Sequence, residues 1–286
     1  MKTLIGKNNY LFLQNDSNKE LEVHNNNLCL VDDNFHLKYE KYLHQYLLIV
    51  FPNKSLVQKE YLPDGFDLKY RPAFQKYQKY LGEHVLDLYP FLINKDTFYK
   101  TDTHINFYGA YISYGLVVEK IKRMFNLPLE KKNINIQTTE CVLINLQLGL
   151  GDLTWETNLG DQFIENTVDT YYHSDDIELI FPKYEIKTND KIKILDYELN
   201  DCTEKLIGSP VNWDVVSNYI IHSKNDTVEV KKKFLIFYDS FLLSSLTLWM
   251  LTFYDVYFVK SNFNEEVIKK INPDYIFEFR VERFLN

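Results

Sequence analysis

The chain has 286 residues and a net charge of −8, and 45% of its residues are hydrophobic while 25% are charged. This length and composition are typical of one large globular domain, with or without an insertion, and they exclude a disordered chain or a small scaffold that depends on disulfides or metals. Because 40 acidic residues outweigh 32 basic ones, we expect no broad basic surface and no nucleic-acid partner.

The cysteines and the apolar runs of the sequence indicate the cellular compartment of the protein. Cys29, Cys141 and Cys202 are odd in number and too scattered for a disulfide framework or a C-x-x-C metal site. Residues 1–13 contain no apolar run of the kind found in signal peptides. The longest apolar run, residues 241–254, is shorter than the ~20 residues that a membrane span needs. We therefore expect a cytoplasmic protein with no membrane span.

The first part of the chain predicts alternating strands and helices. Residues 47–51 form a continuous apolar run closed by Pro52, which is typical of a strand buried on both faces. A helix is predicted over 72–81, a short strand over 85–88, and a long helix over 107–125, where apolar residues recur every three or four positions. This alternation indicates parallel strands connected by helices.

The middle segment, residues 133–230, has short β-prone runs separated by Asn, Asp and Gly, so we predict a β-rich insertion there. The alternation then returns, with strands predicted at 234–238, 256–259 and 275–279 and helices at 241–253 and 265–271. The predicted fold is an α/β core with a parallel sheet flanked by helices, built from residues 1–132 and 231–286 and interrupted by the insertion.

Ser240 is the candidate nucleophile, in the run Tyr238-Asp239-Ser240-Phe241 at the turn from a predicted buried strand to a helix. Parallel α/β folds bind ligands at the carboxyl ends of strands, and the first N–H groups of a helix can hold an oxyanion. The alternative interpretation is that Asp239 and Ser240 only cap the helix, as these residue types often do.

His104 is the candidate base for Ser240, because it follows Asp102 by two positions. In an extended segment, residues i and i+2 point to the same side, so Asp102 could hold one ring nitrogen of His104 and leave the other for the serine. Asp-x-His pairs are also common by chance, so this spacing alone does not decide the matter. The other six histidines have no recognisable partner in the sequence and are interpreted as surface or core residues.

Other chemistries find little support in the sequence. No glycine-rich phosphate loop occurs among the 9 glycines, which argues against nucleotide hydrolysis. The pairs Asp32-Asp33 and Asp175-Asp176 lie in loop-like segments, and adjacent side chains diverge, so we interpret them as solvated charge. No metal site is predicted.

Several short elements occur in order along most of the chain. The two that carry the candidate residues read Tyr99-Lys100-Thr101-Asp102-Thr103-His104-Ile105-Asn106, followed by Gly109-Ala110, and Tyr238-Asp239-Ser240-Phe241. The others are 6–13, 52–54 with 61–63, 85–88, Gly151-Asp152-Leu153, and 273–274 with 281–285. Together they resemble the alginate O-acetyltransferase family of the AlgX and AlgJ type, a branch of the SGNH-hydrolase-like proteins, whose motifs read Y-x-x-T-D-T-H-W-N-x-x-G-A and G-D-S-F.

This resemblance implies an SGNH-hydrolase-like α/β fold in which Asp102, His104 and Ser240 form a catalytic triad. Ser240 would be the nucleophile, His104 its general base and Asp102 the group that orients the base, while the backbone N–H of Ser240 helps to hold the oxyanion. The chain departs from the family motifs at two positions. Tyr238 replaces a glycine and would crowd the turn, and Ile105 replaces a tryptophan and would remove an aromatic neighbour of the base.

The resemblance also implies a serine-dependent O-acetyltransferase that acetylates a bacterial surface polysaccharide, of the capsule or O-antigen type, through an acetyl-enzyme. A carbohydrate acetylesterase with the same triad and an inactive carbohydrate-binding relative are the alternatives. We expect acetyl-CoA as the donor, because it is the abundant soluble acetyl donor of the cytoplasm, and no bound cofactor. Asn53, Lys54 and Asn106 follow a predicted strand or adjoin the triad, so they are candidates for substrate binding, with loop capping as the alternative.

Overall fold

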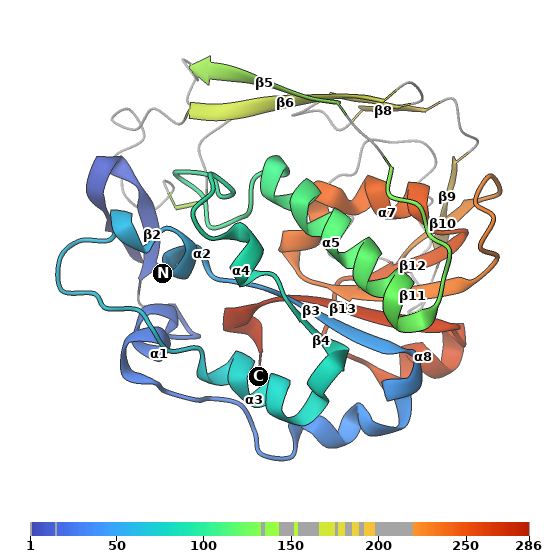
Figure 1. Cartoon of the computed structure of the whole chain (residues 1–286), viewed down its shortest axis with the longest axis horizontal. Coiled ribbons are helices and arrows are strands. Elements are labelled where there is room, and N and C mark those ends of the chain that lie inside the picture. Colours follow the sequence, from blue (N-terminus) through green and yellow to red (C-terminus); the bar gives the residue numbers. More distant parts are fainter. Residues whose placement is uncertain are drawn as a thin grey trace.

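The computed structural model describes residues 2–14, 16–132, 135–142, 152–153, 166–174, 177–180, 185–188, 192–197 and 220–285. Its main element is a seven-stranded sheet with the strand order β4-β3-β13-β11-β12-β10-β9 (Figure 1). The strands are β3 (Tyr46–Phe51), β4 (Val85–Asp87), β9 (Ile192–Tyr197), β10 (Ile220–Asn225), β11 (Lys233–Tyr238), β12 (Asp255–Val259) and β13 (Tyr275–Val281). The strands from β4 to β12 in this order are parallel, and β10 and β9 continue the sheet antiparallel.

The central strands of this sheet are buried on both faces. In β3, Leu47 and Ile49 belong to one hydrophobic cluster and Leu48 and Val50 to another, because successive strand residues point to opposite faces. Side chains of α5 (Phe107–Phe125) and α7 (Leu246–Thr252) complete the first cluster, and those of α3 (Pro72–Leu81) and α8 (Glu265–Ile271) complete the second. Figure 1 shows α5 and α7 on one side of the sheet and α3 on the other. The predicted parallel sheet flanked by helices is confirmed.

Short helices connect these elements. The other α-helices of the described residues are α1 (Glu20–Asn26), α2 (Lys54–Val57) and α4 (Tyr89–Leu92). The 3-10 helices found there are η1 (Lys7–Asn9), η2 (Phe35–Lys38), η3 (Glu40–Gln45), η4 (Lys59–Tyr61), η5 (Gly82–His84), η7 (Ser240–Ser245) and η8 (Glu282–Phe284). Within the described ranges, no helix combines the length and the apolar character that crossing a membrane requires.

The helix predicted over 241–253 is in fact two pieces, the 3-10 helix η7 followed by the α-helix α7. Side chains near the join bind the backbone locally, since the Ser245 hydroxyl donates to the carbonyl of Leu242 at 3.2 Å. Such side-chain to backbone bonds compete with the regular hydrogen bonds of an α-helix. The apolar pattern carries no information about them, so it predicted one continuous helix. The consequence for the site is that Ser240 begins a tight 3-10 turn.

The described strands of residues 133–230 fall into two groups. The strands β5 (Asn135–Val142), β6 (Asn166–Ser174), β7 (Ile177–Ile180) and β8 (Glu185–Thr188) form a separate antiparallel sheet, at the top of Figure 1. In contrast, β9 and β10 are the antiparallel strands at one edge of the main sheet. The β-rich character of this segment was predicted, and the addition of its last strands to the core sheet was not.

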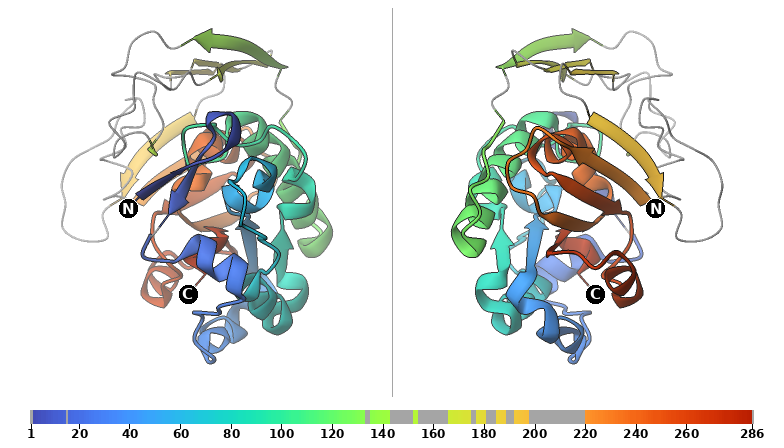
Figure 2. Two further views of the ribbon diagram at one scale, coloured as in Figure 1. Left: turned by 90° about the vertical axis from the view of Figure 1, so that its left-hand side faces the viewer. Right: turned by 90° about the vertical axis from the view of Figure 1, so that its right-hand side faces the viewer.

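An N-terminal hairpin, which the sequence patterns did not predict, lies next to the core (Figure 2). It consists of β1 (Lys2–Ile5) and β2 (Leu11–Gln14), paired antiparallel. The amide of Leu11 donates to the carbonyl of Lys100 at 3.0 Å. The hairpin therefore contacts the loop that precedes Asp102, and it helps to position that loop.

Candidate active site

Ser240 lies directly beyond the carboxyl end of β11 and is the first residue of η7. The preceding residue, Asp239, is buried, and its carboxylate accepts hydrogen bonds from the amide of Phe241 at 2.9 Å and from the amide of Val281 at 2.6 Å. Asp239 thus fixes the turn and joins it to the end of β13. The amide of Ser240 occupies the first helical position, where no intrahelical acceptor exists.

The structure brings the three predicted residues into one hydrogen-bonded chain. The Nε2 atom of His104 lies 2.7 Å from the Oγ atom of Ser240, and its Nδ1 atom lies 2.5 Å from Oδ1 of Asp102. The same aspartate oxygen accepts the backbone N–H of His104 at 2.8 Å. Residues 101–104 are bent rather than extended, so this local backbone bond, and not the alternation of a strand, places the carboxylate beside the ring.

This network sets the proton positions. Burial opposes charge on both groups, but hydrogen bonding and charge pairing with His104 hold the pKa of Asp102 below its ordinary value. Burial also opposes the protonation of His104, but the Asp102 carboxylate outweighs it and raises the pKa of that ring above its usual 6.5. With Asp102 ionised, Nδ1–H of His104 donates to it, and Nε2 is free to accept the hydroxyl proton of Ser240.

Lys54 supports the loop that carries Asp102. Its side chain is only 3% exposed, and its ammonium group donates to the carbonyls of Leu11 at 2.7 Å, Lys100 at 2.8 Å and Asp102 at 3.0 Å. The buried charge therefore links β2, α2 and the 100–102 loop. We predicted Lys54 as a substrate-binding residue, and we correct this to a supporting role because the ammonium is enclosed by protein carbonyls.

Asn53 and Asn106 are also turned into the protein. Asn53 is 1% exposed, and its side chain contacts Nε2 of His24 at 2.7 Å and accepts the amide of Arg283 at 3.3 Å. Asn106 is 6% exposed and caps α5 by accepting the amide of Gly109 at 2.9 Å. The predicted substrate contacts of these two residues are thus replaced by structural ones, and for Asn106 the capping alternative describes the geometry.

The sequence matches the family described as "SGNH hydrolase-like domain, acetyltransferase AlgX" over residues 4–172, which is more than half of the chain. The chain belongs to this family. The match confirms the predicted resemblance and the SGNH-hydrolase-like fold. No curated protein matches the chain.

Solved structures share the fold of this SGNH-like acetyltransferase family member at low sequence identity. PatB1 from Bacillus cereus has a TM-score of 0.61 at 13% identity, with 99% of this chain and 97% of that chain covered. A DHHW family protein from Eubacterium siraeum has a TM-score of 0.60 at 13% identity, over 100% and 95%. The O-acetyltransferase domain of Pseudomonas putida AlgJ has a TM-score of 0.52 at 13% identity, over 99% and 92%. At these identities the likeness concerns the fold.

The two departures from the family motifs have different consequences in this SGNH-like domain. Tyr238 is fully buried, and its ring packs edge-on against Phe258 within the hydrophobic core. Ile105 is 1% exposed and lies in the core, and Phe241 instead supplies an aromatic neighbour, with its ring centroid 5.3 Å from that of His104. Both substitutions leave the contact between His104 and Ser240 intact.

A pocket of about 380 Å³ opens beside Ser240. It is lined by the end of β11, the segment after β12 and the end of β13, and its residues are Tyr238, Asp239, Ser240, Lys260, Ser261, Asn262, Arg280 and Phe284. The lining is polar apart from aromatic side chains, and the volume falls in the range of small-ligand sites. Ser240 therefore lies in the wall of an open space that is large enough for a small ligand.

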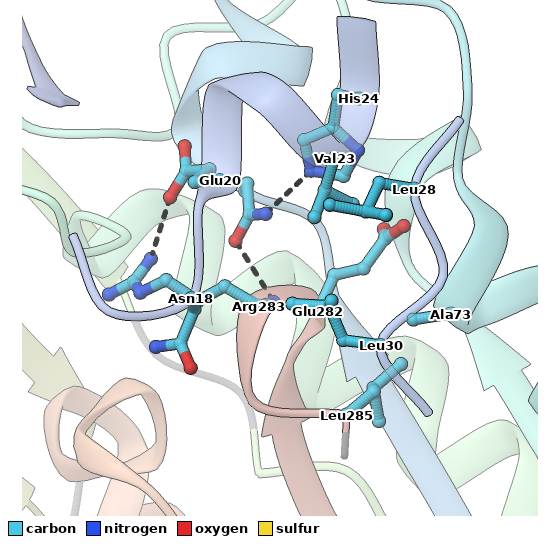
Figure 3. Close-up of a pocket in the computed structure, with 11 residues that line it drawn as sticks. Asn18, Glu20, Val23, His24, Leu28, Leu30, Ala73, Glu282, Arg283 and Leu285 are labelled. Atoms are coloured by element: carbon cyan, nitrogen blue, oxygen red, sulfur yellow. Dashed lines mark hydrogen bonds and ion pairs between the residues drawn. The ribbon is translucent and has the colours of Figure 1, made fainter. Parts of the chain in front are cut away.

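Two residues near the site had no role assigned from the sequence, although both lie in family elements. Arg283 lies over the ring of Phe241, 5.4 Å from its centroid, and pairs with the buried Glu20 at 3.5 Å (Figure 3). Asp152 approaches His104, with Oδ2 3.7 Å from Nδ1. In the sequence, these two residues are marked only by the family elements Gly151-Asp152-Leu153 and 281–285. Neither element indicates what the residue does.

Among the residues that the structure describes, Asp102, His104 and Asp152 are the grouping of carboxylate and imidazole atoms close enough to consider for a metal ion, within 4.8 Å of one another. The ligand atoms of this cluster are already engaged with each other and with Thr103. The arrangement fits proton transfer between Ser240 and His104 better than metal coordination.

Proposed function

We propose that this protein is a serine-dependent O-acetyltransferase that acetylates hydroxyl groups of a bacterial surface polysaccharide, of the capsule or O-antigen type. The observation that carries the proposal is the chain of contacts from Asp102 through His104 to Ser240, in a member of an acetyltransferase family. In this proposal Ser240 is the nucleophile, His104 the general base and Asp102 the group that orients and stabilises the base.

In the first half-reaction, the Oγ atom of Ser240 attacks the carbonyl carbon of the acetyl donor. The hydroxyl proton moves to Nε2 of His104 across the 2.7 Å contact, and Asp102 stabilises the resulting imidazolium. When the tetrahedral intermediate collapses, the bond to the leaving group breaks, and the leaving group takes the proton from Nε2. The product is an acetyl ester on Ser240.

In the second half-reaction, a sugar hydroxyl attacks the acetyl-enzyme. Its proton moves to Nε2 of His104 and then to Oγ of Ser240, which leaves as the regenerated hydroxyl, while the acetyl group stays on the sugar. The backbone N–H of Ser240 is the proposed oxyanion donor in both steps. The neighbouring amide of Phe241 is unsuited to this role, because it already donates to Asp239 at 2.9 Å.

The pocket beside Ser240 is the proposed seat of the acceptor sugar. Its volume of about 380 Å³ suits one or two sugar rings. The amide of Asn262 and the hydroxyl of Ser261 can bind the hydroxyl groups of a sugar, and the ring of Phe284 can pack against its apolar face. Transfer to a sugar rather than to water requires that the acceptor displaces water from this space.

Acetyl-CoA is the proposed donor, and no bound cofactor is needed for the chemistry above. Its thioester would supply the acetyl group, and CoA would leave as a thiol with the proton from His104. The phosphates of CoA call for cations near the pocket, and Lys260 lines it. A cytoplasmic location is the matching proposal for the compartment.

The proposal is tested in cells by measuring the acetyl content of the surface polysaccharide with mass spectrometry. The strains compared are the parent, a strain with the gene deleted, and the deletion strain complemented with the gene that carries Ser240→Ala or Ser244→Ala. We expect acetyl groups to be lost without the gene and not restored by Ser240→Ala, while Ser244→Ala, a serine in the same helix, restores them. A gain of acetyl groups on deletion would instead indicate an acetylesterase. No change would contradict both activities and favour a carbohydrate-binding relative.

A further inference from the structure

We propose that Asp152 is a positioning residue that locks Asp102 onto His104 and presents a second carboxylate to the imidazole ring. The inference deepens the proposed function, because it assumes that His104 acts as the base. Asp152 is separated from the Asp102 loop by a long stretch of sequence, and it lies within residues 133–230, the predicted insertion. Residues 152–153 nevertheless contact the loop that carries Asp102 and His104.

The contacts between Asp152 and this loop are reciprocal. The carboxylate of Asp152 accepts the amide of Thr103 at 2.8 Å on one oxygen and the hydroxyl of Thr103 at 2.6 Å on the other. In return, the amide of Asp152 donates to Oδ2 of Asp102 at 3.0 Å. Since Oδ1 of Asp102 bonds the ring and backbone of His104, both carboxylate oxygens are occupied and the plane of the group is fixed.

The segment that carries Asp152 is itself anchored. Leu153 is fully buried and clusters with Leu11 and Leu13 of β2. Its amide donates to the carbonyl of Thr101 at 3.2 Å, and its carbonyl accepts the hydroxyl of Thr3 at 2.6 Å. Asp152 is therefore held against the Asp102 loop by packing and by backbone bonds on either side of its carboxylate.

The position of Asp152 also gives it an electrostatic effect on His104. Its Oδ2 atom lies 3.7 Å from Nδ1 of His104, where a negative charge favours the imidazolium. Among the residues that the structure describes, the charged groups that act on this ring are the carboxylates of Asp102 and Asp152, which raise the pKa of His104, and the guanidinium of Arg283, which lowers it. Removing the Asp152 carboxylate should therefore make His104 harder to protonate.

The test compares Asp152→Asn, which keeps the size and one acceptor oxygen, with Asp152→Ala and with the exposed control Glu130→Gln. The pKa of His104 is measured by NMR titration of ¹⁵N-histidine, with its signal assigned from His104→Gln, and kcat/KM is measured against pH. We expect the pKa of His104 and the acid limb of the profile to move to lower pH in both Asp152 variants. The maximal kcat should fall about 10- to 100-fold, by analogy with the residues that orient metal-ligating histidines, whose loss costs a similar factor. Glu130→Gln should change neither.

An unchanged pKa of His104 in Asp152→Asn would overturn the proposal, whether or not kcat falls, because a merely structural role lowers activity without moving that titration. An unchanged kcat would overturn it too. The NMR readout needs no turnover, so it separates this inference from the proposed function. If Ser240→Ala kept full activity, the proposed function would fail, while the effect of Asp152 on the His104 titration could still be measured.

Discussion

The Nε2 atom of His104 lies 2.7 Å from the Oγ atom of Ser240, although 136 positions separate the two residues in the chain. The loop before α5 supplies the histidine, and the end of β11 supplies the serine. The histidine loop follows β4, and β4 is joined to β11 through β3 and β13, all paired in parallel. Parallel strands bring their carboxyl ends to one edge of the sheet, so the histidine loop and the serine meet there.

This contact predicts how activity responds to substitution. His104→Ala should lose nearly as much kcat as Ser240→Ala, on the order of 10⁴-fold or more, because residues that act as a unit are not additive. Asp102→Asn should lose somewhat less, since the orienting carboxylate is the least costly of the three to remove. Steady-state kinetics with an activated acetyl ester would measure all three.

The chain offers a matched control for the histidine. His222 contacts Asp255 at 2.7 Å and stacks on Tyr257, so it forms another Asp-His pair, away from Ser240. His222→Gln should therefore leave kcat unchanged. Loss of activity in His222→Gln with retention in His104→Ala would show that the base has been assigned to the wrong histidine.

The pH dependence follows from the raised pKa of His104. The ring must be neutral to accept a proton from Ser240, so activity should be present above the pKa of His104 and fall as the pH drops through it. Because Asp102 raises this pKa above its usual 6.5, the acid limb of kcat/KM should lie higher than for an unperturbed histidine. A profile that stays flat well below pH 6.5 would argue against a neutral His104 as the base.

Lys54 should matter for stability as well as for activity. Lys54→Met keeps most of the side chain's bulk but leaves three carbonyls, including those of Leu11 and Asp102, without their cationic donor. We expect the free energy of unfolding to fall by at least ~3 kcal/mol, since three hydrogen bonds are lost and a single hydrogen bond to a charged group contributes roughly 1.5–3 kcal/mol. Urea unfolding would measure this, with exposed Lys59→Met as the control. Equal stability of the two variants would refute the supporting role of Lys54.

Tyr238 tests whether this chain has adapted to the residue that replaces the glycine of the family motif. Tyr238→Gly restores the motif but removes a fully buried ring, so the free energy of unfolding should fall by at least about 3–5 kcal/mol. Tyr238→Phe should be neutral or stabilising, because no hydrogen-bond partner for the buried hydroxyl is found among the described residues. Thermal unfolding would compare them, and a stable, more active Tyr238→Gly would contradict this account.

Lys260 allows a test of the donor. Lys260→Gln should raise the KM for acetyl-CoA and weaken its dependence on salt, because a cation near the phosphates would be removed. The KM for p-nitrophenyl acetate, which carries no phosphate, should not change. Rapid turnover of p-nitrophenyl acetate with no consumption of acetyl-CoA, tested with candidate glycans, would contradict acetyl-CoA as the donor.

The parts of the fold that depend on local pattern could be predicted from the sequence. The apolar runs at 47–51 and 234–238 are the strands β3 and β11, and the helix predicted over 107–125 is α5 with the same bounds. The hairpin of β1 and β2 was not predicted, and neither was the addition of β10 to the core sheet, because both depend on pairing between distant segments. Pairing partners leave no periodic signal in one sequence.

The active-site residues likewise divide into those that the sequence predicts and those that depend on distant partners. The proximity of Asp102 and His104 is local, and Ser240 was selected by its place at a strand end and by the family resemblance. The roles of Lys54 and Asp152 could not be predicted, because their partners lie 43 or more residues away and are largely backbone groups, whose identity the sequence does not encode. The carbonyl partners of the buried Lys54 ammonium can be identified only from the three-dimensional structure.

The most direct test of the central claim is the location of the acetyl group during turnover. The protein is mixed with an acetyl donor, quenched in acid, digested and analysed by mass spectrometry, with Ser240→Ala and Ser244→Ala in parallel. We expect one acetyl group on the peptide that contains Ser240, its absence in Ser240→Ala, its retention in Ser244→Ala, and its loss when an acceptor glycan is added before the quench. Acetylation at another residue, or undiminished turnover by Ser240→Ala, would contradict the account.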